Sequence, residues 1–239
     1  SEQDTLVKHY EHLNEKFYKK VGVNRSIDTY KRYCVALNHL KNFLQKKYKV
    51  RDMAFQSLNP TFVKAFDLYL RADLKMTCNT IVNIMARLHL VIKSAMDNGL
   101  IKQDPFMDYK YLTEPLVAKC LSEEEFNLIL TTPLPKDNMN LVRDVFIFSC
   151  MTGLAFSDLR NLTPENMKQA EDGVWWIHTA RKKTGTPCHI PLMELPLQLI
   201  KKYCGISDQG RLFPMLSCSK TNINLKKLSL IHISEPTRP

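Results

Sequence analysis

The first hundred residues repeat apolar side chains at helical intervals. Tyr30, Tyr33, Leu37, Leu40 and Leu44 follow one another at steps of three and four, the spacing that places side chains on one face of an α-helix. No run of alternating apolar and polar residues, which would indicate a strand, interrupts this part of the sequence. A sheet-based fold is therefore not expected here, and we predict an all-helical first domain.

The helical signals of this domain have recognisable boundaries. Gly99 follows the last of them directly, as is common at helix ends. A bundle of about four helices is predicted over residues 1–112, and a loose segment, residues 113–119, is the expected linker. The helices are expected over residues 6–17, 30–44, 60–70 and 78–98.

The second domain, residues 120–227, opens with a strong helix-start signal. Ser122 can cap the first helix, and Glu125 can complete a capping box. Two strand signals follow at residues 174–179 and 188–190, joined by a basic turn. We predict a mainly α protein whose second domain is α+β with a small hairpin. Further helices are expected over residues 139–150, 156–162, 195–204 and 222–227.

The chain is strongly basic. Its 34 Lys and Arg residues against 24 Asp and Glu give a formal net charge of +10, which favours a polyanionic partner through phosphate contacts. Nucleic acid is the first expectation and an anionic membrane surface the second. No stretch approaches the roughly 18 apolar residues of a membrane span, and the N-terminus lacks the apolar body of a signal peptide. We expect a cytoplasmic protein.

Seven cysteines are scattered along the chain without a Cys-x-x-Cys pair. Several stand in apolar runs, such as Cys150 after residues 146–149. This pattern indicates small core residues in a reducing compartment.

Both ends of the chain have an unusual sequence. The chain begins without methionine and enters a helical pattern almost at once, so we expect something to precede it. Residues 228–238 resemble the conceptual translation of a sequencing-library adapter, the alternative being an ordinary polar tail. We therefore interpret residues 228–239 as a non-native tail and exclude His232 and Arg238 from the candidate site.

Several short motifs occur in a characteristic order. They are Asn79-Thr80-Ile81, Asp104-Pro105-Phe106, Thr152-Gly153-Leu154, and Lys182-Lys183-Thr184-Gly185 ahead of Ile190-Pro191-Leu192. With this order and spacing, the chain from Thr5 to Lys227 resembles the tyrosine recombinases, or phage-type integrases, and is most similar to those of Bacteroidetes mobile elements. The resemblance implies a SAM-like core-binding bundle followed by a recombinase catalytic domain.

The resemblance also implies a chemistry. The intact protein is expected to cleave DNA with a tyrosine hydroxyl, to form a 3′-phosphotyrosyl bond and to rejoin the strand without a metal or cofactor. Double-stranded DNA is the implied partner, bound by a tetramer in a bacterial, nucleoid-associated setting, with no membrane and no small-molecule substrate. The family's His-x-x-Arg motif and its tyrosine lie downstream of Lys227, so we expect this chain to end before them, to bind DNA weakly and to be inactive.

Three basic residues of the hairpin turn are candidates for work at the scissile phosphate. By resemblance, Lys183 is the proton donor for the leaving 5′-oxygen, a role that a flexible ammonium on a turn can perform. The alternative is a solvated basic turn. Arg181 and Lys182 are expected to anchor phosphates.

Ala155 stands where the family carries an arginine. A guanidinium suits a phosphate by its charge and its fork of donors, so another residue must supply that stabilisation. Arg143 is the candidate, provided that the chain doubles back at Gly153, and an ion pair with Asp144 is its alternative. Arg160 is a weaker second candidate.

Asp158 occupies the position of the family's acidic residue. We expect it to support the site by orienting basic side chains, although capping of its helix would explain it as well. His178 and His189 lie on neighbouring predicted strands and are interpreted as a structural cross-strand pair, so no metal site is predicted.

The helical domain offers candidates for DNA contact, with a solvated helix face as the alternative. They are Lys31, Arg32, Arg87 and Lys93. Two other functions remain open for the whole chain: a non-enzymatic DNA-binding or regulatory relative, and a type IB topoisomerase.

Overall fold

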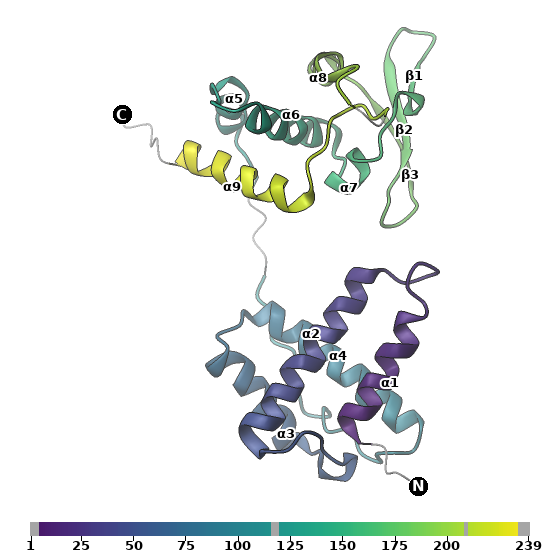
Figure 1. Cartoon of the computed structure of the whole chain (residues 1–239), viewed down its shortest axis with the longest axis vertical. Helices are drawn as coiled ribbons and strands as arrows, with labels where there is room; N and C mark the ends of the chain where they lie inside the picture. The colour runs from purple at the N-terminus through teal and green to yellow at the C-terminus, as the bar shows by residue number, and fades with distance from the viewer. Residues whose placement is uncertain (1–4, 116–119, 208–209, 234–239) are drawn as a thin grey trace. The chain divides into compact units, whose positions relative to one another are not determined.

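The computed structural model describes residues 5–115, 120–207 and 210–233. It divides into two compact units, Ser1–Val117 and Ala118–Pro239, and each unit is described by itself (Figure 1). The division falls inside the segment predicted as the linker. No helix among the described residues is long and apolar enough to cross a membrane.

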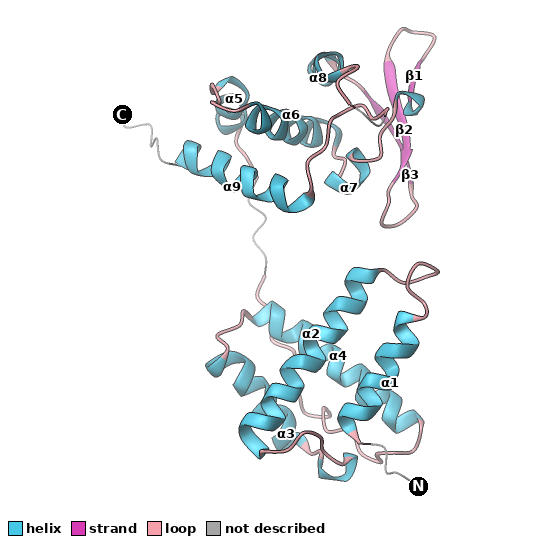
Figure 2. Ribbon diagram, viewed as in Figure 1, coloured by secondary structure: helices cyan, strands magenta, loops and turns pink. Residues whose placement is uncertain are grey.

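The first unit is built from helices and loops in the part that the structure describes (Figure 2). Its buried core is formed by apolar residues of all four α-helices, among them Tyr10, Phe43, Phe66 and Met85. The predicted all-helical bundle is therefore confirmed. Its elements are α1 (Leu6–Tyr18), α2 (Ile27–Phe43), η1 (Leu44–Tyr48), η2 (Phe55–Ser57), α3 (Pro60–Leu68), η3 (Tyr69–Asp73) and α4 (Cys78–Asp97).

Local signals in the sequence account for these helix boundaries. The side chain of Asn59 accepts a hydrogen bond from the Phe62 N–H at 2.9 Å, which caps α3 ahead of Pro60. Gly99 takes a φ of +71° just beyond α4, a backbone conformation that favours glycine.

The segment after α4 is tied back onto the helices. The ring of His89 on α4 contacts Asp104 through Nε2 and the Tyr111 hydroxyl through Nδ1, both at 2.8 Å. Asn79 also exchanges two hydrogen bonds with the backbone of Glu114. The first unit therefore includes residues up to at least 114, two residues beyond the predicted domain end.

The second unit packs helices against a small antiparallel sheet with the strand order β1-β2-β3. Ile177 on β2 is fully buried in a core that also contains Phe148 and Phe213. The predicted capping box at Ser122 and Glu125 is present. The elements are α5 (Glu123–Thr131), α6 (Asp137–Thr152), α7 (Phe156–Leu159), η4 (Pro164–Asn166), β1 (Met167–Gln169), β2 (Trp175–Ala180), β3 (Pro187–Pro191), α8 (Glu194–Tyr203) and α9 (Cys218–Ile233).

The structure corrects three sequence predictions. Strand β1 was not predicted, because its three residues are too few to show an alternation. Helix α9 continues past Lys227 to Ile233, and Leu228 is only 3% exposed, so excluding residues 228–233 from the fold was wrong. Residues 234–239 lie outside the described residues. Cys150 is exposed, and the other six thiols are exposed or half-buried, so the cysteines are not core residues; all seven are free.

Candidate functional site

The segment between α6 and α7 makes a sharp turn at Gly153. This residue has a φ of +65°, in the left-handed region that glycine adopts readily, and its N–H donates to the Ser149 carbonyl at 2.8 Å. Leu154 then enters the core with 1% of its surface exposed, whereas Ala155 is exposed and precedes the first residue of α7. The position at which the family carries an arginine is therefore open to solvent.

A buried carboxylate organises this turn. Asp158 is 4% exposed, and its oxygens accept from the Ala155 N–H at 3.3 Å, the Arg181 guanidinium at 3.2 Å and the Lys182 N–H at 2.9 Å. Burial raises the pKa of this carboxyl, but the hydrogen bonds, led by the one from the Lys182 backbone, outweigh burial and hold the pKa below its ordinary value. Asp158 is therefore a charged link between α7 and the β2–β3 hairpin.

Both of the roles considered for Asp158 are represented in this geometry. Its Oδ2 atom caps the backbone at Ala155, and the same atom receives Nη1 of Arg181. The two groups thus meet at one oxygen atom. This brings the Arg181 guanidinium next to the backbone at Ala155.

The turn between β2 and β3 holds the remaining candidates. The Arg181 N–H donates to the Thr186 carbonyl at 2.8 Å, and the Gly185 N–H donates to the Arg181 carbonyl at 2.7 Å. Lys182 and Lys183 are exposed on this closed turn. Within the described ranges, neither ammonium has a hydrogen bond or an ion pair, so both are available to an anionic ligand.

Arg143 is occupied elsewhere in the unit. Its Nε lies 2.9 Å from Asp144, its Nη1 donates to the Thr132 carbonyl at 3.0 Å, and its side chain is 13% exposed. Asp144 also accepts from Lys202 at 2.6 Å and from the Tyr203 hydroxyl at 2.8 Å. The structure thus contains the ion pair that was the alternative for Arg143, and no contact joins Arg143 to residues 153–158 among those described.

The two histidines form a pair across β2 and β3. His178 and His189 are directly opposite in the register, and their Nδ1 atoms lie 2.7 Å apart. The predicted cross-strand pair is present. No group of three or more potential metal ligands gathers anywhere in the described part of the chain.

The DNA-contact candidates of the first unit differ in their surroundings. Lys31, Arg32 and Lys93 are exposed. Arg87 is half-buried, its Nη1 bonds to the Asn83 carbonyl of its own helix, and its guanidinium lies 5.6 Å from the Tyr33 ring centre. Lys31, Arg32 and Lys93 are therefore better placed than Arg87 to contact a phosphate directly.

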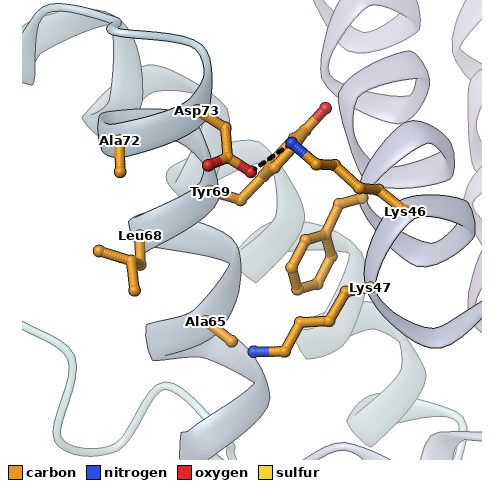
Figure 3. A pocket seen from close by; sticks show the side chains of 8 residues that line it. Lys46, Lys47, Ala65, Leu68, Tyr69, Ala72 and Asp73 are labelled. Atoms are coloured by element: carbon orange, nitrogen blue, oxygen red, sulfur yellow. Dashed lines mark hydrogen bonds and ion pairs between the residues drawn. The ribbon is translucent and has the colours of Figure 1, made fainter.

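A groove of about 350 Å³ also lies in the first unit, between η1 and the helix formed by α3 and η3 (Figure 3). Its walls carry Lys46 and Lys47, but Lys46 is paired with Asp73 at 2.8 Å and lies 5.7 Å from the Tyr69 ring centre. The groove's lining residues, which include Tyr69, lie outside the turn at residues 153–158 and the hairpin turn at residues 181–185. It is therefore not the candidate site for chemistry.

Comparisons with known proteins converge on one group. Residues 5–111 match the family model described as the phage integrase SAM-like domain. The fold is similar to a lambda integrase tetramer bound to a Holliday junction, with 12% identity and a TM-score of 0.72 over 97% of this chain and 66% of that chain. A lambda integrase dimer bound to a COC′ core site gives 12% identity and a TM-score of 0.74 over 96% and 64%.

A Tn1549 transposon integrase in complex with circular intermediate DNA is also similar, with 18% identity and a TM-score of 0.69 over 98% of this chain and 80% of that chain. The present chain spans just under two thirds of the lambda integrase chains in the tetramer and the dimer named above. The comparison with curated proteins gives no match.

Proposed function

We propose that the chain belongs to the tyrosine-recombinase integrases and is part of a site-specific DNA recombinase, since its first unit matches the phage integrase SAM-like domain and its fold is similar to that of integrases. Its two units would bind duplex DNA, and the hairpin of the second would face the scissile phosphate. The single observation that carries this proposal is the basic cluster of Arg181, Lys182 and Lys183, fixed to the recombinase motif by Asp158.

The residues of the cluster would divide the work at the phosphate. Lys183 would donate the proton to the leaving 5′-oxygen, since its ammonium is exposed on a closed turn and is not engaged by any described residue. Lys182 would hold a neighbouring phosphate, with its backbone already fixed by Asp158. Asp158 would act as a positioning residue, because it is buried and binds the Arg181 guanidinium and the backbone N–H groups of Lys182 and Ala155.

Arg181 is the residue that we propose in place of the arginine missing at Ala155. Its Nη1 shares an oxygen of Asp158 with the Ala155 N–H, and its side chain is 36% exposed. Nη2 and Nε have no partner among the described residues, so part of the guanidinium fork is free to bind a phosphate.

The nucleophile would not come from the tyrosine of the second unit. Tyr203 is the only tyrosine after Tyr111 in the sequence. Its hydroxyl is 2.8 Å from Asp144, and burial together with this hydrogen bond raises its pKa well above the ordinary value. A buried, protonated hydroxyl is a poor nucleophile, so we propose that this chain alone binds DNA without cleaving it.

A tetramer on DNA is part of the same proposal, since one of the similar structures is a lambda integrase tetramer bound to a Holliday junction. The proposal also places the protein on DNA in a bacterial cytoplasm. The competing function is a DNA-binding relative without chemistry, which the loss of arginine at Ala155 favours.

The purified chain tests the proposal with a labelled pool of random 40-bp duplexes. We expect retarded complexes whose affinity falls steeply with salt, and no labelled band after denaturation in detergent. Absence of binding at low salt would overturn the proposal of DNA binding, and a detergent-resistant adduct would overturn the proposal that the chain is inactive. Sequencing the source DNA across the codons for residues 222–239 separates recombinase from binding module: a continuing frame with His-x-x-Arg and tyrosine indicates the former, and a stop codon the latter.

A further inference from the structure

The turn between α1 and α2, residues 19–25, is closed by its own backbone. The Lys20 carbonyl accepts from the N–H groups of Val23, Asn24 and Arg25, each at 3.2 Å. The Gly22 N–H donates to the Arg25 carbonyl at 3.0 Å, and Gly22 has a φ of +84° that favours glycine. The turn therefore has a defined shape before any partner binds, so little ordering entropy is lost on binding.

An apolar side chain stands at the apex of this turn. Val23 is 84% exposed, the largest value for a sizeable apolar side chain among the described residues. Single exposed apolar residues are common, so exposure alone does not indicate a partner. Its position on a closed turn is more informative, because this side chain cannot retract by a small change of the loop.

Several exposed cations lie near Val23 in the sequence. Within the described part of the chain, none of these exposed cations forms an ion pair. Glu15 and Asp28 are the acidic residues next to them in the sequence. The guanidinium of Arg25 lies 5.5 Å from the Phe17 ring centre, which restricts its direction. The exposed cations are Lys16, Lys19, Lys20 and Arg25 on the turn and its approach, and Lys31 and Arg32 at the start of α2.

An apolar apex within a field of cations matches the two kinds of surface that a DNA groove offers. Phosphates line the edges of the groove, and the thymine C5-methyl group is an apolar feature on the floor of the major groove. A membrane surface would also attract the cations, but a single valine provides very little apolar area for insertion. The observations therefore favour duplex DNA.

We propose that the α1–α2 turn is a DNA-reading element, with Val23 contacting thymine methyl groups in the major groove and Lys19, Lys20 and Arg25 holding the flanking phosphates. This inference rests on the proposed DNA-binding function and extends it to a specific surface. It adds a contact to a DNA base near the start of α2, where Lys31 and Arg32 were the candidates for DNA contact.

The test compares Val23→Ser with Val35→Ser, a matched control on the exposed surface of α2 (52% exposed). The probes are a duplex enriched from the random pool by the wild-type chain and the same duplex with uracil in place of thymine, which lacks the methyl groups. We expect Val23→Ser to weaken binding three- to tenfold. Uracil should weaken wild-type binding to the same degree and should not weaken Val23→Ser further. Val35→Ser should behave as wild type.

A second pair of variants tests the cations. Lys19→Ala/Lys20→Ala should lower the slope of log affinity against log salt by about 1 per lysine, whereas Lys102→Ala/Lys110→Ala should leave it unchanged. An effect of the lysines without an effect of Val23 or uracil would overturn base reading. If the wild-type chain binds DNA and no turn variant changes the binding, the role of the turn is overturned while the proposed DNA-binding function stands. If the wild-type chain fails to bind DNA, the proposed function is overturned as well. Equal dependence on Val23 in binding to phosphatidylserine vesicles would assign the turn to membranes and overturn the proposal.

Discussion

The Arg181 guanidinium and the Ala155 backbone N–H donate to the same oxygen of Asp158, at 3.2 and 3.3 Å. Arg181, the residue directly after β2, is thereby placed next to the backbone of Ala155. The chain separation between Arg181 and Asp158 is 23 residues, so this contact exists only once the hairpin has packed on α7. A single carboxylate thus links the backbone at Ala155 to the guanidinium that we propose as the replacement for the missing arginine.

Asp158→Asn should loosen the hairpin from α7. A neutral amide accepts more weakly from Lys182 and Arg181, and hydrogen bonds to a charged group contribute about 1.5–3 kcal/mol each. We expect the free energy of unfolding of the second unit to fall by about 2 kcal/mol at neutral pH, as measured by denaturant titration. An unchanged stability would show that the carboxylate is not the link.

The same variant predicts a pH dependence. The pKa of Asp158 is lowered in the folded chain, so its stabilisation is complete above the unfolded value of about 3.9 and is lost as pH falls through the folded pKa. The stability gap between wild type and Asp158→Asn should therefore be constant from pH 7 to about pH 5 and close below about pH 4. Denaturation at several pH values measures the gap, and one that widened in acid would contradict the assignment.

Arg181→Ala should weaken DNA binding more than Lys182→Ala. The guanidinium combines a fixed direction with several donors, whereas the lysine is a flexible point charge. We expect a loss of about tenfold for Arg181→Ala, two- to threefold for Lys182→Ala, and only partial recovery with Arg181→Lys. Gel-shift titration at two salt concentrations measures the effect, and Arg160→Ala provides an exposed control directly after α7. If Arg181→Ala and Arg160→Ala lose the same amount of DNA affinity, Arg181 contributes only as a general surface charge.

Arg143→Ala should act on stability and leave DNA binding unchanged. The substitution removes an ion pair from Asp144, which is 2% exposed and keeps only Lys202 and Tyr203 as partners. We expect unfolding to become easier by about 1–3 kcal/mol, because a buried charge loses a partner. DNA affinity per folded molecule should stay within twofold of wild type. A tenfold loss of affinity at unchanged stability would restore Arg143 as a phosphate ligand.

The periodic parts of the chain were predictable because local rules determined them. The helices of the first unit follow from spacing and capping, as at Asn59 and Gly99, and the hairpin follows from its alternating strand and basic turn. The partner of Arg143 could be offered only as an alternative, because a charge among apolar neighbours signals a partner without identifying it.

The site was less predictable than the fold. Nothing local links Arg181 to Asp158, since their contact depends on packing between two elements. The cations at Lys19 and Lys20 were missed for a different reason: a short polar turn has no periodicity to draw attention to it. The available signal was Gly22 followed by the apolar Val23, then Asn24 and Arg25.

Leu228 provides the last test, because sequence and structure differ there. The sequence from 228 onward suggested a tail without a role, yet Leu228 is 3% exposed and belongs to the core of the second unit. Leu228→Ala should destabilise this unit by about 2–4 kcal/mol, since a buried leucine leaves a cavity when truncated. Ile223→Ala on the same helix, at a position 54% exposed, should change stability by less than 1 kcal/mol. Denaturant titration monitored by tryptophan fluorescence reports on the second unit, because both tryptophans, Trp175 and Trp176, lie on its strand β2. If Leu228→Ala is as stable as Ile223→Ala, the end of α9 is dispensable for the core. Residues from 228 onward would then not contribute to the fold, as the sequence interpretation of a non-native tail implied.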